Sequence, residues 1–338
     1  MPSLQRPPLP RPRGPVSEQL LEALVQPPHT VPLPAGADAD PFADDDVALA
    51  LYCCYELHYR GLAGVDDRWE WEPSLLAFRA ALEAPFEAAL LAAVPRPEPV
   101  APDATDLALR AIIDADDAPS LSRFVETRAT LEQLQEFLAH RSSYLLKEAD
   151  PQTFAIPRLT GGPKAAMVEI QADEYGGGRP ARVHQQLFAD EMAAVGLDPS
   201  YGAYLDVTPA PMLAIVNLMS LLGLHRRHSA AMAGHLAAAE MTSSVPNRRY
   251  ANGLRRLGLD HATAYHDEHV VADAVHENIA AVDLVGGLAR QDPQLGADAL
   301  WGAATAVEIE ARFARYVWDA WERGECSLLA PLGAAAPA

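Results

Sequence analysis

Apolar side chains recur along most of this chain at the three- and four-residue spacing of an α-helix. From residue 103 onward such segments follow one another with Pro, Gly or Asp between them, and alternating β-branched runs are nearly absent. No internal repeat is visible. The pattern predicts an all-α bundle around one core, with helices over residues 103–115, 119–148, 162–176, 181–196, 209–243, 246–257, 260–289 and 296–323.

The first part of the chain has a different pattern. Residues 1–40 are rich in proline and hold one apolar run, over 17–26, so we expect a flexible or loosely docked segment. Two amphipathic helices then form a predicted helical hairpin over 43–95, joined by VDDRWEWEP, and Pro85 predicts a kink or break in the second helix. We therefore expect one helical domain over residues 41–330 and an Ala/Pro tail over 331–338.

Composition narrows the classes of partner. The 338 residues include 26 Lys and Arg against 46 Asp and Glu, a formal net charge of −20, which repels phosphate backbones and anionic membranes. Three cysteines, two of them adjacent, form neither a disulfide framework nor a zinc pattern, and no stretch has the pattern of a signal peptide or membrane span. We expect a cytoplasmic protein without nucleic-acid or membrane partners.

The clearest chemical signal is the segment AYHDEHVVADAVHENIAAVD. On a helix, His269, Asp273 and His276 fall at positions i, i+4 and i+7 and so project from one face. Two imidazoles and a carboxylate at this spacing suit a cation such as iron, manganese or zinc. The alternative is a solvated polar stripe with incidental histidines, and His266 would replace His269 if the register were different.

Four further residues are candidate ligands on other segments. Glu240 ends a run of small and apolar residues, where an unpaired buried carboxylate is costly. Glu174 and His184 are separated by three glycines and a proline, so a broken helix would bring them together, although a plain loop explains the glycines equally well. Glu148 lies near a helix end beside a lysine, where surface pairing is the ordinary explanation.

Together these residues have the composition of a non-haem iron site. Four carboxylates balance the charge of two ferrous ions, and the set contains imidazoles but no thiolate. A ferritin-like bundle would need a Glu-x-x-His motif on two helices, and no histidine of this chain has a glutamate three residues before it. The candidate ligands are Glu148, Glu174, His184, Glu240, His269, Asp273 and His276.

The order Glu-x9-His, then a lone Glu, then His-x3-Asp-x2-His resembles the haem-oxygenase-like di-iron oxidase and oxygenase superfamily. The surrounding segments, among them VEIQADEYGGG and YHDEHVVADAVHE, are similar to its actinobacterial "iron-containing redox enzyme" branch over roughly residues 120–325. The resemblance implies a haem-oxygenase-like bundle with a metal-binding core over about 119–325. It also implies that Glu174 and His184 bind one iron and that Glu240 bridges the two irons. His269, Asp273 and His276 would complete both sites.

The same resemblance implies the chemistry. Two Fe(II) ions would reduce O2 to a peroxo-di-iron(III) species that oxidises a small organic substrate by N-oxygenation or oxidative C–C cleavage. Glu148 matches an extra carboxylate of the N-oxygenating type. An external reductant and a homodimer are compatible with such an enzyme, as is a third core helix that orders when metal binds.

Other residues are candidates for roles outside the metal ligand set. Arg248 and Arg249 follow Glu240 and would hold a substrate carboxylate, unless they pair with the acidic surface. Tyr175 would reach a bound oxygen species or only pack. Two alternative functions remain: a haem-binding or metal-free relative on the same scaffold, and a helical interaction protein whose polar cluster is structural.

Overall fold

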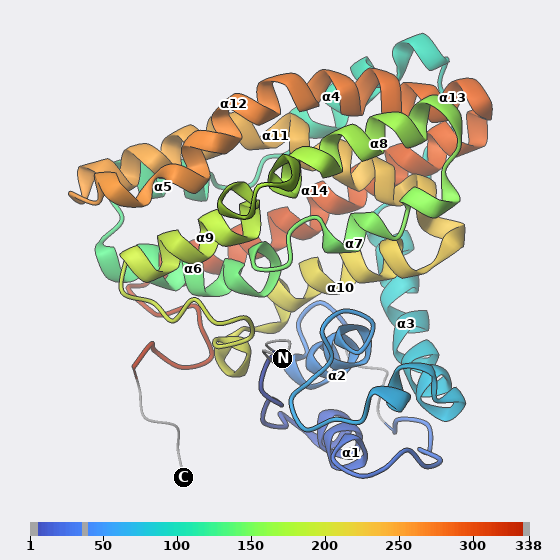
Figure 1. The fold of residues 1–338 in the computed structure, drawn as a ribbon, viewed down its shortest axis with the longest axis vertical. Helices are drawn as coiled ribbons and strands as arrows, with labels where there is room; N and C mark the ends of the chain where they lie inside the picture. The colour runs from blue at the N-terminus through green and yellow to red at the C-terminus, as the bar shows by residue number, and fades with distance from the viewer. Residues whose placement is uncertain (1–5, 36–39, 334–338) are drawn as a thin grey trace.

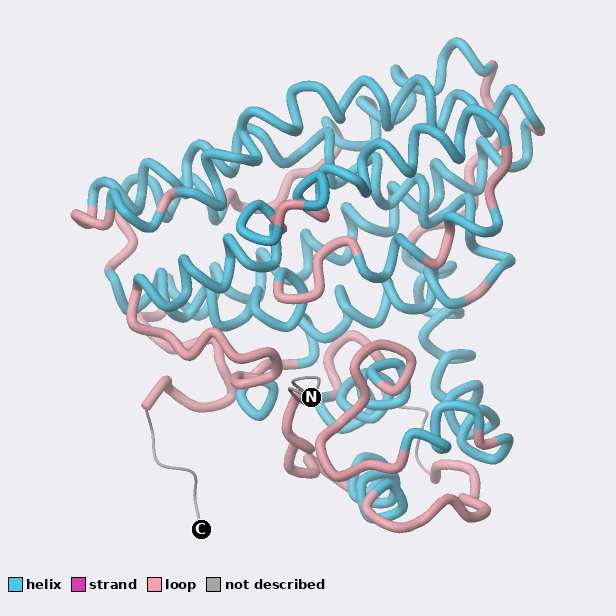
Figure 2. The backbone as a smooth tube through the Cα atoms, viewed as in Figure 1, coloured by secondary structure: helices cyan, strands magenta, loops and turns pink. Residues whose placement is uncertain are grey.

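The computed structural model describes residues 6–35 and 40–333, and for Asp273 and Ala274 it describes the backbone alone. Within these residues the chain is helical with connecting loops and contains no strand (Figure 2). The all-α prediction is confirmed. None of the described helices has the length and apolarity to cross a bilayer. Of the expected tail over 331–338, residues 334–338 lie outside the described part of the chain.

Two long helices form the centre of the bundle, α11 (Ser229–Arg256) and α14 (Pro293–Glu322). They run antiparallel and approach closely through small residues. A Cβ added at Gly234 would lie 1.7 Å from the carbonyl oxygen of Ala299, and one added at Gly302 would lie 1.9 Å from that of Ala231. Only glycine is compatible with backbones this close together, so these two positions fix the separation of the helices.

The remaining core helices surround this pair (Figure 1). Ser120 caps α5 (Leu121–Thr127) and Thr130 forms a capping box at the start of α6 (Leu131–Leu145), so the expected helix over 119–148 is divided in two. These core helices are α4 (Thr105–Asp114), α5 (Leu121–Thr127), α6 (Leu131–Leu145), α7 (Asp150–Thr153), α8 (Gly161–Glu174), α9 (His184–Ala194), α10 (Ala210–Leu224), α12 (Ala264–Asn278) and α13 (Gly286–Gln291).

Two other helix boundaries differ from the prediction. The break expected near residue 245 occurs at His225–His228 instead, and Pro246 lies inside α11. Because the α10 segment is buried on nearly all sides, tertiary packing and not the proline decides where the chain turns. The helix expected over 260–289 contains a π-helix at Ile279–Val285, between α12 and α13.

The N-terminal part packs against one side of the bundle, below α10 in Figure 1. The predicted hairpin consists of α2 (Asp45–Glu56) and α3 (Pro73–Ala93), and α3 continues through Pro85 without ending. Residues within 1–40 are docked more tightly than we expected. They form α1 (Pro15–Leu24), in which Leu20 and Leu24 are fully buried and whose first amides donate to the Asp46 carboxylate at 2.7–2.8 Å.

Candidate metal centre

Glu148 lies on a tight connection between two helices. α6 ends at Leu145, α7 begins at Asp150, and Ala149 between them has a positive φ of 72°, a conformation that costs free energy in a residue other than glycine. The turn directs Glu148 inward, where the side chain is only 11% exposed. The Tyr265 hydroxyl lies 3.0 Å from each oxygen of this carboxylate and donates to it.

Glu174 and His184 are brought together by the break in the helix that the glycines predicted. Glu174 is the last residue of α8, His184 is the first of α9, and Gly176, Gly177 and Gly178 all have positive φ between them. A Cβ at Gly176 would lie 2.7 Å from the backbone of Arg182, so this reversal requires glycine. The result is a distance of 3.0 Å between Glu174 Oε2 and His184 Nδ1.

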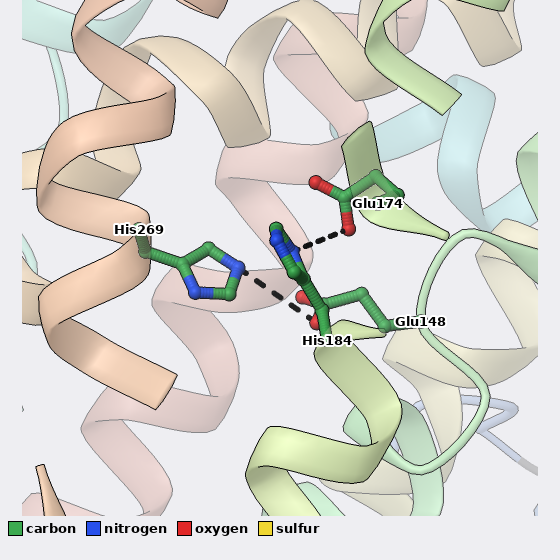
Figure 3. Close-up of side chains that lie close together, drawn as sticks. All are labelled: Glu148, Glu174, His184 and His269. Carbon is green, nitrogen blue, oxygen red and sulfur yellow. Dashed lines mark ion pairs between the residues drawn. The ribbon is translucent and has the colours of Figure 1, made fainter. Parts of the chain in front are cut away.

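A first group of candidate ligands forms around these two residues. Glu148, Glu174, His184 and His269 each offer an oxygen or nitrogen atom, and these atoms all lie within 4.8 Å of one another. Figure 3 shows the four side chains pointing toward one another from α8, α9, α12 and the turn after α6. His269 Nε2 is 3.8 Å from Glu148 Oε2, and the rings of His184 and His269 have centroids 4.4 Å apart.

A second group shares one carboxylate with the first. Glu174, Glu240 and His276 also offer ligand atoms within 4.8 Å of one another. His276 Nδ1 is 3.3 Å from Glu240 Oε2, and its Nε2 is 3.3 Å from Asp173 Oδ2. Among the described residues Glu174 is thus the carboxylate common to both groups, whereas the resemblance gave the bridging role to Glu240.

Six of the seven sequence-predicted ligands are therefore brought together. The seventh, Asp273, belongs to α12 between His269 and His276, but its side chain lies outside the described residues. His266 is not an alternative to His269, because its two ring nitrogens face Asn247 Oδ1 at 2.6 Å and Glu191 Oε1 at 3.1 Å.

The six described candidate ligands, here called the cage, interact through their charges, and these interactions shift several of their pKa values. Burial opposes ionisation of Glu174, but contact with His184 and the charges of His269 and His276 outweigh it and lower the pKa of Glu174. Burial likewise opposes protonation of His184, and the contact with Glu174 overcomes this and raises the pKa of His184 to about 9. For His269 burial is the dominant effect, and its pKa falls to about 4. The pKa of His276 is raised, because Glu240 outweighs burial.

Several ligand atoms in the cage are buried without a hydrogen bond. They are Glu174 Oε2, both ring nitrogens of His184, and Nδ1 of His276. Buried polar atoms are normally satisfied, and unsatisfied ones at close range to one another need a partner that the protein does not supply. Carboxylate oxygens and imidazole nitrogens within 4.8 Å fit one cation at bond lengths of about 2 Å from each. The residues present therefore fit iron.

A cavity of about 320 Å³ adjoins both groups. Its lining is mainly apolar, and it includes Glu148, Glu174, Glu240 and His269. Besides Glu174, three buried side chains of this lining have an unpartnered polar atom among the described residues: Oε1 of Gln152, Nε2 of Gln171 and Nδ1 of His235. The cavity thus offers a mostly apolar space beside the candidate ligands, with a few polar groups that can orient a bound molecule.

The arginines expected to bind substrate are not part of this cavity. Arg248 is exposed, and Arg249 faces Glu126 and Ser120, so neither lines it. The surface-pairing alternative describes Arg249 better. The arginine of the lining is Arg141 on α6, which forms two hydrogen bonds of 2.7–2.8 Å to Glu310 on α14. Charge composition along the sequence gave no signal for it.

The tyrosine at the centre also differs from the expected one. The Tyr175 hydroxyl lies 2.9 Å from both Asp150 and Thr153 and does not line the cavity. Tyr265 does line it and contacts Glu148. Tyr265 precedes His269 by one helical turn, so helical spacing alone would have indicated it.

Comparison with known families agrees with this geometry. The chain matches the family of iron-containing redox enzymes over residues 135–311, just over half of its length. The matched part begins in α6 and ends in α14, and so contains every candidate ligand. Among curated proteins none matches the chain. The expected similarity to the haem-oxygenase-like superfamily is confirmed, and the chain belongs to the iron-containing redox enzyme family.

Proposed function

We propose that the protein is a non-haem di-iron oxygenase or oxidase that uses O2 to oxidise a small organic molecule bound in the cavity. The observation that carries this proposal is Glu174, a buried carboxylate shared by two groups of ligand atoms beside that cavity. Because Glu174 belongs to both groups of ligand atoms, its carboxylate can bridge one cation in each group. Membership of an iron-containing redox family supports iron as the metal.

The ligands divide between two sites. The first uses Glu148, Glu174, His184 and His269, and the second uses Glu174, Glu240 and His276. Asp273 stays a predicted ligand of this pair of sites, because it lies four residues after His269 and three before His276 on α12. With Asp273 included, four carboxylates and three imidazoles neutralise two divalent cations that burial would otherwise make costly.

Other residues hold the ligands in the required orientation. His269 Nδ1 lies 2.8 Å from the carbonyl oxygen of Tyr265 and donates to it, so Nε2 is left to bind metal. Nε2 of His276 lies 3.3 Å from Oδ2 of Asp173, whose charge favours a proton on Nε2 and so leaves Nδ1 for the second site. Tyr265 fixes the carboxylate of Glu148.

A pair of ferrous ions held by these ligands would supply electrons to dioxygen, and the oxidant formed from dioxygen would take electrons from the substrate. The chain binds and orients the substrate: apolar side chains exclude water, and Gln171 Nε2 and His235 Nδ1 offer hydrogen bonds. Both N-oxygenation and oxidative C–C cleavage fit this site, and the position of Glu148 at the cavity supports the first. An external reductant would return the irons to the ferrous state.

Anaerobic loading with ⁵⁷Fe(II) tests the proposal. We expect two irons per chain, two distinct ferrous signals in Mössbauer spectroscopy, and oxygen uptake on mixing with O2. A Soret band on addition of haem, with no iron bound in its absence, would indicate the haem-binding alternative. Binding of neither, with a large loss of stability after Glu174→Ala, would indicate a structural polar cluster.

A further inference from the structure

The turn that carries Glu148 is held by residues from the N-terminal part of the chain, which lies outside the matched family region. Arg60 follows α2, and its Nη2 donates to the carbonyl oxygen of Leu146 at 2.9 Å and to Oε1 of Gln185 at 3.0 Å. The guanidinium lies 4.4 Å from the ring centroid of Tyr201, which keeps its plane in place.

Gln185 connects the same arginine to two candidate ligands. It follows His184 directly in α9, and its Nε2 donates to the carbonyl oxygen of Glu148 at 2.7 Å and to Oδ1 of Asp150 at 3.0 Å. Arg60 therefore contacts the turn of Glu148 directly and the segment of His184 through Gln185. Two ligands of the first site, separated by 35 residues along the chain, are coupled through one guanidinium.

A buried ion pair holds the turn from its other side. Lys147 is 1% exposed, and its Nζ lies 3.1 Å from Oε2 of Glu56 at the end of α2. The Tyr201 hydroxyl donates to the same Glu56 oxygen at 2.6 Å. Adjacent side chains of the turn thus point in opposite directions, with Lys147 toward α2 and Glu148 toward the cage.

We propose that Arg60 is a positioning residue that sets the spacing between Glu148 and His184, so that the N-terminal part of the chain controls metal affinity at the first site. The inference rests on the di-iron function proposed above. The Arg60 guanidinium donates to Leu146 and Gln185 at the same time and so restricts the positions of both. Metal ligands bind best when their positions are fixed before the metal arrives. Within the described part of the chain, Arg60 contacts neither Glu240 on α11 nor His276 on α12, which belong to the second site.

Arg60→Met tests the inference because it removes the donors and keeps an apolar stem against Tyr201. Arg158→Met is the matched control, since the Arg158 guanidinium likewise donates to two acceptors, here the backbone carbonyls of Gly223 and Leu224, away from the ligands. We expect the first site to lose about 10–100-fold in Fe(II) affinity in Arg60→Met, the effect typical of a residue that orients a ligand. We expect the second site, and both sites in Arg158→Met, to change less than about threefold.

A measurement without metal accompanies the titration. In the metal-free protein, Arg60→Met should accelerate amide hydrogen exchange in a peptide covering residues 146–150 and leave α11 unchanged. Equal affinity of the variant and wild type for two irons, or an equal loss at both sites, would overturn the inference and leave the di-iron proposal intact. Failure of the wild type to bind iron would refute the proposed function, and this inference with it.

Discussion

Two buried glutamates of this protein show how a structural charge differs from one that binds a ligand. Glu56 is fully buried, and Lys147, Tyr201 and the backbone amide of Arg60 all contact its carboxylate. Glu174 is almost as buried at 6% exposure, yet its Oε2 forms no hydrogen bond within the described residues and faces histidines in the same condition. Both charges need compensation. The chain supplies hydrogen bonds and a lysine to Glu56, whereas Glu174 Oε2 has, in the described part of the chain, only the ion pair with His184 at 3.0 Å.

The difference identifies which region depends on a cation. A buried charge without compensation costs several kcal/mol, on the order of 3–5 when a partner is removed. The Glu56 pair meets this cost at all times and stabilises the fold. The Glu174 cage meets it in the metal-free state only by holding a proton on His184, whose pKa of about 9 lies above its usual value. We infer that a bound cation would compensate the charge of Glu174, and that the proton on His184 takes this role when no cation is bound.

Among substitutions in and around the cage, Glu174→Ala should have the largest effect on iron binding. Because Glu174 belongs to both groups of ligands, we expect loss of both irons and of oxygen uptake. The metal-free protein should lose only the contribution of the His184 contact, because His184 can then release its proton. Bound iron after desalting and urea unfolding measure the two effects. Glu169→Ala, an exposed residue of the same helix, is the control and should bind two irons. Two irons in Glu174→Ala would contradict the proposed sites.

Lys147→Met should give the opposite result. Glu56 would remain buried without its cation, so we expect a loss of about 3–5 kcal/mol in the free energy of unfolding in urea. The double variant Glu56→Gln with Lys147→Met should recover most of it, because no buried charge then remains. A loss below about 1 kcal/mol in the single variant would show that the pair is not structural.

Metal affinity should depend on pH through His184. Below its pKa of about 9 this histidine holds a proton that must leave before the nitrogen can bind metal. Apparent Fe(II) affinity should therefore rise with pH, by up to about tenfold per unit between pH 6.5 and 9. His269, with a pKa of about 4, is already neutral there and adds nothing. Calorimetry in buffers of different ionisation enthalpy measures the released protons, and no release at pH 7 would contradict this prediction.

The pKa of His184 also affects the stability of the metal-free protein. A pKa raised in the folded state stabilises it below the unfolded value of 6.5, and this stabilisation is lost as pH rises through about 9. The melting temperature of the metal-free protein should fall over this range. Iron-loaded protein, in which His184 is already neutral, should lack that fall.

The smallest expected effect is that of Tyr265→Phe. It removes one donor to Glu148 and keeps the ring, so we expect about a tenfold or smaller loss of Fe(II) affinity, confined to the first site. Tyr175→Phe is the control, because that hydroxyl contacts Asp150 and Thr153. An equal effect of both variants on iron binding would remove Tyr265 from the site.

Local spacing along the sequence predicted much of this centre. His269 and His276 share one face of a helix, and the glycines before His184 require a break, so both features follow from neighbouring residues. Which carboxylate lies between the two groups depends on where the packing of α8 against the π-helix Ile279–Val285 places Glu174, and no local pattern contains that information. The same holds for Arg60, whose role depends on contacts with residues 86 and 125 positions away.

The misplaced features have the same cause. The charge of Arg248 and Arg249, close to Glu240 in the sequence, predicts that they bind a substrate carboxylate. Both lie on a side of α11 that does not line the cavity. The chain turns at His225–His228 because the packing of α10 ends there, while Pro246 is accommodated within a helix. Propensity predicts where a helix is favourable, and long-range packing decides where it ends.

The two glycines between α11 and α14 have a consequence for the size of the substrate. Both helices supply residues to the cavity lining, Ala239 and Glu240 from α11 and Ala306 and Glu310 from α14. Because the contact at Gly234 and Gly302 leaves no room for a methyl group, adding one there would force the helices apart. The width of the cavity therefore depends on Gly234 and Gly302, although neither glycine belongs to its lining.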